Sequence, residues 1–225
     1  MSADGHTIAV GAGSDDVGNQ IDQGSAYVFT RSGRTWTQQA HLIWNVLSGK
    51  PMTPRGPPRF FGMSVAISGD AKTILVSALE GEVAGAKDQG STYVYRRSGA
   101  AWIQEARLIP SGGNPDDHGE SALALSFDGN TALVGAESHA AVPTDQGTIF
   151  IFTRANGKWS QHSRLLATEG ARGDLFGISG VLKPDGTMAL MGAHLDDVDG
   201  INNLGSVFEF QLIPGPSVPV QSESK

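Results

Sequence analysis

The chain has 225 residues, with 30 glycines, 11 prolines, no cysteine and a formal net charge of −7. An acidic surface repels phosphate groups, so the charge argues against nucleic acid and anionic membranes as partners. The lack of cysteine excludes disulfides, thiol catalysis and cysteine zinc sites, and no stretch approaches the ~20 apolar residues of a membrane span. The first residues, MSADGHTIAV, lack the basic and apolar regions of a signal peptide.

One phrase occurs four times along the chain. It reads DQGSAYVF at 22–29, DQGSTYVY at 88–95, DQGTIFIF at 145–152 and, in a more divergent copy, NLGSVFEF at 203–210. An apolar segment such as TIAVGA precedes each copy, and a segment that opens with tryptophan follows the first three. Repetition at intervals of roughly 60 residues is typical of a propeller or another repeat array.

Each unit contains four segments with strand character. The first is short, as at 64–68, and the second, as at 73–78, is almost continuously apolar, which indicates burial on both faces. The third alternates large and small side chains. In the fourth, alternation predicts one face with Trp102, Gln104, Ala106 and Leu108, and another with Ile103, Glu105 and Arg107. The sequence predicts an all-β protein, a β-propeller built of four-stranded antiparallel blades.

The domain organisation follows from the units. We expect a single propeller domain over residues 1–213, with repeats at about 1–47, 60–111, 117–168 and 174–213, and a proline-rich flexible tail over 214–225. Unit one lacks its first strand and unit four its fourth, so the first and last blades are predicted to be incomplete. A partial or fragmentary propeller, a four-bladed ring and a homo-oligomer through the incomplete edge blades are the alternatives, because unpaired strand edges recruit other chains.

The repeated residues resemble a known family. FG-x-S at the start of a unit, as in FGMS at 61–64, then GA at the end of the second strand and DQGS-x-Y-V-F in the third, are similar to the FG-GAP repeat. That repeat builds the head of integrin α-subunits and many bacterial surface and secreted propellers. The resemblance implies a propeller fold, an extracellular or cell-surface location, and ligand binding at the rim that integrins use. The family's calcium loop between strands one and two is absent, since short turns such as SGDAKT replace it.

The predicted ligand-binding rim carries the loops between strands two and three and the connections between units. These segments are long and variable, and variable loops on a rigid frame are the usual place of binding sites. The rim residues predicted to contact a ligand are Asp15, Asp16, Glu80, Glu82, Asp116, Asp117, His118, His139 and His194. Clustered carboxylates suit Ca²⁺, so Asp196, Asp197 and Asp199 are a candidate calcium site, with solvated turn residues as the alternative.

Residues that recur in several units favour structural roles. Asp22, Asp88 and Asp145 are interpreted as caps of the turn before the third strand, because an enzyme rarely needs the same acid three times. Trp36, Trp102 and Trp159 are interpreted as blade-packing residues, with sugar stacking as the alternative. Three Gly-x-Ser matches lack the strand-to-helix turn of a nucleophile elbow, so no catalytic residue is predicted.

These features favour a non-enzymatic ligand-binding or adhesion module of an exported bacterial protein, with a glycan or a protein as ligand. One alternative is a glycan-active hydrolase or lyase that uses rim carboxylates, and another is a passive structural repeat array. A pair of carboxylates held about 5 or 7–9 Å apart in a deep pocket would favour the enzyme, and a shallow, wet rim would favour binding.

Overall fold

The structure is a computed structural model that describes residues 1–44, 59–80, 90–111, 122–136, 146–167, 170–171 and 173–212. Within these residues the regular structure consists of fourteen β-strands. No helix of the described chain is long and apolar enough to cross a membrane. The predicted tail at 214–225 lies outside the described residues.

The strands form four antiparallel sheets, and each sheet is one blade. Blade one contains β1 (Thr7–Ala12), β2 (Ser25–Ser32) and β3 (Thr35–Leu42). Blade two contains β4 (Arg59–Ile67), β5 (Thr73–Glu80), β6 (Ser91–Ser98) and β7 (Ala101–Leu108). Blade three contains β8 (Leu123–Leu125), β9 (Thr131–Ala136), β10 (Thr148–Ala155) and β11 (Lys158–Leu165), and blade four contains β12 (Ser179–Leu182), β13 (Met188–Ala193) and β14 (Ser206–Gln211).

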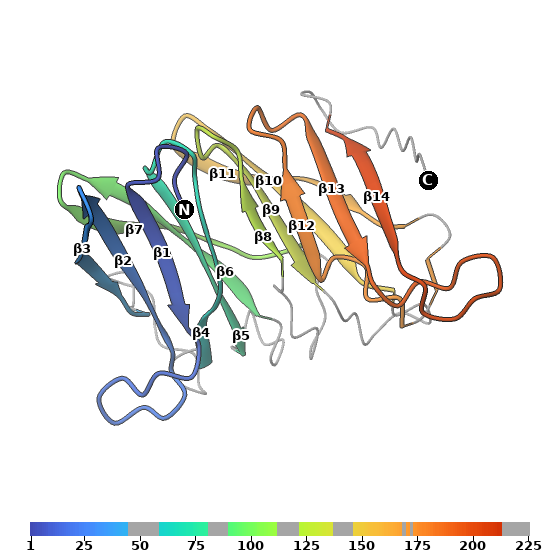
Figure 1. The fold of residues 1–225 in the computed structure, drawn as a ribbon, viewed down its shortest axis with the longest axis horizontal. Coiled ribbons are helices and arrows are strands. Elements are labelled where there is room, and N and C mark those ends of the chain that lie inside the picture. Colours follow the sequence, from blue (N-terminus) through green and yellow to red (C-terminus); the bar gives the residue numbers. More distant parts are fainter. Residues whose placement is uncertain are drawn as a thin grey trace.

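The blades lie side by side in a row, with blade one and blade four at opposite ends (Figure 1). Blades two and three have four strands each, whereas blades one and four have three strands within the described residues. Blade one has no described counterpart of β4, and blade four has none of β7. The predicted all-β propeller architecture with incomplete first and last blades is confirmed.

A short polar turn leads into the second strand of a blade. In blade two, Ser68 Oγ donates to Asp70 Oδ1 at 2.6 Å, and the same carboxylate oxygen accepts the backbone N–H of Lys72 at 3.0 Å. Ser126 and Asp128 make the same 2.6 Å contact in blade three. An aspartate that binds the backbone two residues later stabilises a tight turn, which explains why this turn recurs in the sequence.

The apolar core lies between neighbouring blades. On β5, Ile74 and Val76 pack towards blade one, where they meet Val28 of β2. Leu75, between them in sequence, packs towards blade three, where it meets Val134 of β9. The predicted burial of the second strand on both faces is therefore confirmed for blade two, and it follows from the position of that strand between two neighbours.

The repeated phrase and the Phe-Gly pair meet at the junctions between blades. The backbone N–H of Phe61, which is fully buried, donates to Gln23 O at 2.9 Å. A Cβ on Gly24, whose φ is +81°, would lie 2.1 Å from Phe61 O. Between blades three and four, a Cβ on Gly147 would lie 1.9 Å from Phe176 O. The glycine of the phrase thus allows two backbones to touch, in addition to preceding the third strand.

The fourth strands contain a β-bulge that the sequence did not predict. In blade two the register shifts, so that Val94 pairs with Ala106 while the next residue, Tyr95, pairs with Gln104. Glu105 is the extra residue on β7. A bulge of one residue moves the side chains that follow it to the opposite face of the sheet.

The predicted alternation of the fourth strand in blade two is therefore wrong. Trp102 packs towards blade one, as part of the cluster around Phe61. Leu108 and Ala106, which were expected on the face of Trp102, pack towards blade three. Arg107 is shifted to the side of the sheet that faces blade one, where it is the cross-strand partner of Tyr93.

Candidate functional site

The rim loop of blade one connects β1 to β2 and contains Asp15. Its carboxylate accepts hydrogen bonds from Ser25 Oγ at 2.6 Å and from the Tyr27 hydroxyl at 2.9 Å. The His41 ring stacks on the Tyr27 ring with centroids 4.5 Å apart, and His41 Nε2 lies 3.9 Å from the carboxylate. The hydrogen bond from Ser25, followed by that from Tyr27, holds the pKa of Asp15 below its usual range. The carboxylate is therefore engaged by strands of its own blade, with its side chain 33% exposed.

The rim loops of blades one and four use a second aspartate in the same way. Asp16 Oδ1 accepts the backbone N–H of Asp22 at 2.9 Å, and Asp197 Oδ1 accepts that of Asn203 at 2.8 Å. A short antiparallel bridge closes each loop. Both loops are thus small hairpins whose carboxylates hold the loop backbone, as expected of capping residues.

Each of these two loops exposes one isoleucine beside the polar turn at its tip. Ile21 is 73% exposed in blade one, and Ile201 is 56% exposed in blade four. Both loops project from the same edge of the row of blades, at the bottom of the view (Figure 1). This edge is the rim on which the sequence predicted ligand binding.

The candidate calcium site lies in the blade-four loop. Asp197 holds the loop backbone, Asp199 has a φ of +54°, and His194 is exposed. Burial raises the pKa of the nearby Asp174, and the charges of Asp196 and Asp197 add to that effect. Among the described residues, no three histidine, aspartate or glutamate side chains form a group that could hold a metal ion. Calcium at Asp196, Asp197 and Asp199 stays a prediction.

Several predicted residues are not placed by the structure. Glu80 ends β5, and the residues that lie outside the described chain are Glu82, Asp116, Asp117, His118 and His139, together with Asp88 and Asp145. Asp22, the recurring aspartate of blade one, accepts a hydrogen bond from Arg59 Nη2 at 3.0 Å. That contact joins blade one to the first strand of blade two.

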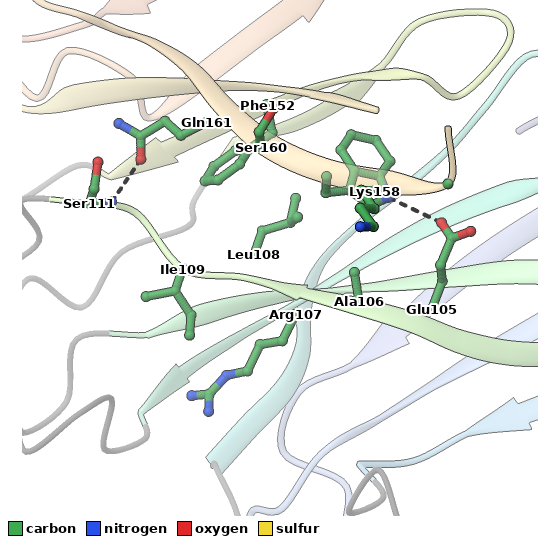
Figure 2. Close-up of a pocket in the computed structure, with 12 residues that line it drawn as sticks. Glu105, Ala106, Arg107, Leu108, Ile109, Ser111, Phe152, Lys158, Ser160 and Gln161 are labelled. Atoms are coloured by element: carbon green, nitrogen blue, oxygen red, sulfur yellow. Dashed lines mark hydrogen bonds between the residues drawn. The ribbon is translucent and has the colours of Figure 1, made fainter. Parts of the chain in front are cut away.

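A groove of about 520 Å³ lies between β7 of blade two and β11 of blade three. Figure 2 shows Leu108 and Ala106 on β7 directed towards β11, and Ser111 beside Gln161 at one end. The backbone N–H of Ser111 donates to Gln161 Oε1 at 2.7 Å. This groove could not be predicted from the sequence, because its shape depends on the bulge in the fourth strand.

Glu105, the bulge residue of β7, lies at the end of the groove opposite Ser111 and Gln161 (Figure 2). It accepts hydrogen bonds from Arg154 Nε at 2.9 Å and from Trp159 Nε1 at 3.1 Å, the latter drawn in Figure 2. The junction between blades one and two repeats this contact, since Trp102 Nε1 donates to Gln39 Oε1 at 3.3 Å. Each of these two tryptophans thus binds the bulge residue of the preceding blade, which supports the blade-packing interpretation for Trp102 and Trp159. Trp36, in the end blade, is instead 39% exposed.

Comparison with known families identifies the repeats. The family model of the FG-GAP repeat matches residues 59–95 and 159–210. The chain contains FG-GAP repeats. The matched stretches include both Phe-Gly pairs at the blade junctions and two copies of the repeated phrase.

Comparison with curated proteins finds no match. Among solved structures, TolB from Acinetobacter baumannii is similar, with a TM-score of 0.47 and 12% sequence identity. The similarity covers 96% of this chain and 41% of the TolB chain. The chain therefore spans about two-fifths of that protein's length.

The Glu105 contact between blades two and three is expected to depend on pH. Burial alone would raise the pKa of Glu105, but hydrogen bonds from Arg154 and Trp159 outweigh it and leave the pKa below its ordinary value. A lowered pKa stabilises the folded state above the unfolded pKa, and the stabilisation is lost as pH falls through the folded pKa. The stability difference between wild type and Glu105→Gln should thus shrink below about pH 4.5. Urea titrations at several pH values measure it, and a pH-independent difference would contradict the assignment.

Proposed function

We propose that the chain is a non-enzymatic ligand-binding or adhesion module, and that its ligand is a protein bound at the rim. The observation that supports this proposal is the pair of rim loops in blades one and four. Their aspartates hold the loop backbone, and the loops expose Ile21 and Ile201 beside their tips.

Rigid loops that each expose an isoleucine suit a protein surface. A loop that is already fixed by internal hydrogen bonds loses little conformational entropy on binding. Apolar surface removed from water contributes about 25 cal/mol per Å², so exposed isoleucines on a fixed frame favour association. A glycan would use hydrogen-bonding groups of the rim, and one carboxylate oxygen of Asp16 and of Asp197 is already taken by the loop backbone. The two exposed isoleucines are the feature that favours a protein over a glycan.

Asp15 of the rim and Glu105 of the groove do not suit the role of general acid in the hydrolase alternative. A general acid must be protonated near neutral pH, which requires a raised pKa. The pKa values of Asp15 and Glu105 are instead lowered, and both carboxylates are engaged by hydrogen bonds. Binding without catalysis is the simpler use of this surface.

An extracellular or cell-surface location belongs to this proposal. It draws on the resemblance to FG-GAP propellers, many of which are surface or secreted proteins. Adhesion is one form of such binding, in which the ligand is a protein of another cell or of the matrix.

The proposal is tested with Ile21→Ser and Ile201→Ser in one double variant. Both side chains are largely exposed, so the variant should fold normally. The labelled chain is applied to an array of purified secreted and surface proteins and to a glycan array. We expect a protein target whose affinity falls about tenfold in the double variant, or roughly 1.4 kcal/mol.

Ile103→Ser is the matched control, since Ile103 is 56% exposed on β7 and away from the rim loops. It should leave binding unchanged. Binding to glycans alone, or protein binding that survives the double variant and falls with the control, would contradict the proposal.

A further inference from the structure

At the junction between blades one and two, a pair of glycines receives the Phe-Gly pair of the next blade. A Cβ on Gly11 would lie 1.9 Å from Gly62 O, and one on Gly24 would lie 2.1 Å from Phe61 O. Gly62 itself has a φ of +92°, and a Cβ on it would overlap Ser25 O. The contact therefore needs glycine on both sides, two in the receiving blade and one in the Phe-Gly pair.

Blades three and four make the same contact. Cβ atoms on Gly135 and Gly147 would lie 2.1 Å from Gly177 O and 1.9 Å from Phe176 O. The backbone N–H of Phe176 donates to Gln146 O at 2.6 Å, which repeats the bond between blades one and two. Two glycines on neighbouring segments of a blade are thus the receiving site for a Phe-Gly pair in this molecule.

Blade four has the same two glycines on its free face. Gly192 on β13 and Gly205 before β14 align with the receiving pairs of blades one and three, and Gly205 has a φ of +82°. The atoms nearest to their ideal Cβ positions belong to Ser179 and His194 of blade four itself. Blade four therefore keeps the receiving glycines, and the described chain brings no Phe-Gly pair to them.

The side chains around these glycines are exposed where the other junctions bury them. Ala26 and Ile149, two residues after the receiving glycine in blades one and three, are fully buried. Val207, at the same place in blade four, is 63% exposed, and Leu204, just before the glycine, is 57% exposed. The face lies at the end of the row of blades, opposite blade one (Figure 1).

The Phe-Gly pairs of this sequence are already in use. The 225 residues contain two such pairs, at 61–62 and 176–177, and both phenylalanines are fully buried at the junctions described above. A second folded copy of the chain has its own pairs buried in the same way. The occupant that fits the face of blade four is therefore a strand of another polypeptide.

One residue distinguishes this face from the junctions inside the molecule. Glu209 stands where blade one has Val28 and blade three has Ile151, both of which are buried. Its Oε1 accepts a hydrogen bond from the uncharged amide of Gln211. An apolar occupant would bury this carboxylate without a counter-charge, which is costly, whereas a lysine or arginine opposite Glu209 would offset that cost.

We propose that the free face of blade four binds a β-strand of another polypeptide that carries a Phe-Gly pair and a basic side chain. The backbone N–H of the phenylalanine donates to Leu204 O, and the Phe-Gly backbone lies against Gly192 and Gly205. Two FG-GAP repeats of this chain begin with a Phe-Gly strand, so the partner is a protein with repeats of this kind. The inference goes beyond the rim proposal, because it concerns a different surface.

The first test tethers a Phe-Gly strand to the intact chain. A second copy of residues 59–67 is fused to the C-terminus through a flexible Gly/Ser linker, which gives an effective concentration of about 1 mM. The readout is the amide NMR signals of Gly192 and Gly205, with that of Gly200 as internal control. We expect shifts of the first two signals and a melting temperature about 2–4 °C above that of the chain with the linker alone.

Two variants of the fused strand are matched controls. In the fused copy alone, Phe61→Ala removes the ring, and Gly62→Ala adds a Cβ at the close contact. Both changes should abolish the shifts and the gain in melting temperature, and neither alters the folded chain. Unshifted signals with the unaltered strand, or equal shifts with the two variants, would overturn the proposal.

The second test changes the receiving face, with folding checked by circular dichroism. Gly205→Ala should abolish the response, whereas Gly200→Ala should preserve it, since Gly200 has a similar φ of +77° and no atom within 4 Å of its ideal Cβ position. Glu209→Val should strengthen the response, because the strand meets Val28 at its own junction. Equal responses of the two glycine variants would overturn the proposal, and an unchanged response in Glu209→Val would overturn the basic side chain.

This proposal and the rim proposal fail separately. The double variant of Ile21 and Ile201 leaves Gly192 and Gly205 in place, so its response to the fused strand should equal that of wild type. Loss of protein binding at the rim with an unchanged response to the strand supports both proposals, and each readout rejects only its own.

Discussion

Replacement of Phe61 by alanine is expected to lower the free energy of unfolding by about 4 kcal/mol. Phe61 is fully buried between blades one and two, and its ring lies 5.5 Å from that of Tyr93 and 6.3 Å from that of Tyr95. Loss of the ring removes apolar contacts and leaves a cavity that two packed sheets cannot close. Urea titration followed by tryptophan fluorescence measures the change.

Phe127→Ala is the matched control for this variant. Phe127 is 50% exposed, so its replacement should change the stability by less than about 1 kcal/mol. A loss at Phe61 that does not exceed the loss at Phe127 would show that the Phe-Gly pair does not hold the blades together.

Gly24→Ala is expected to lower the free energy of unfolding by about 4 kcal/mol or more. Two effects add at this position. Gly24 has a φ of +81°, which alanine adopts at a cost of about 1–2 kcal/mol. The new Cβ would also lie 2.1 Å from Phe61 O, and a backbone oxygen cannot move aside as a flexible side chain can. The junction between blades one and two must therefore separate.

Gly33→Ala separates these two effects. Gly33 has a φ of +59° and no atom within 4 Å of its ideal Cβ position. Gly33→Ala should lower the free energy of unfolding only by the conformational cost of the positive φ, about 1–2 kcal/mol. Equal losses at Gly24 and Gly33 in thermal or urea unfolding would contradict the close approach of the two blades.

The architecture could be predicted because the same pattern of strands recurs in several units of the sequence. A continuously apolar second strand such as 73–78 is recognisable in each unit, and burial on both faces follows from it. The bulge at Glu105 could not be predicted, because one extra residue has no characteristic residue type and the alternation looks regular across it. This extra residue determines which neighbouring blade the side chains of Leu108 and Arg107 face.

The chemistry of the rim was less accessible from the sequence. Asp15 and Asp16 appear in the sequence as an exposed acidic pair, but the partners of Asp15 are Ser25, Tyr27 and His41, which lie on later strands. Whether a carboxylate faces a ligand or its own blade depends on such tertiary contacts. Ligand binding by the rim residues stays a prediction, and so does the calcium site.

The arrangement of the blades in a row has a consequence for how the molecule comes apart. The contacts between strands of different blades join blade one to two, two to three and three to four. The free energy of unfolding of such a row is approximately a sum of the stabilities of the single blades and of the interfaces between adjacent blades. Damage at one junction is then not shared by the others, and melting proceeds from the ends inward, because a terminal unit is held on one side only.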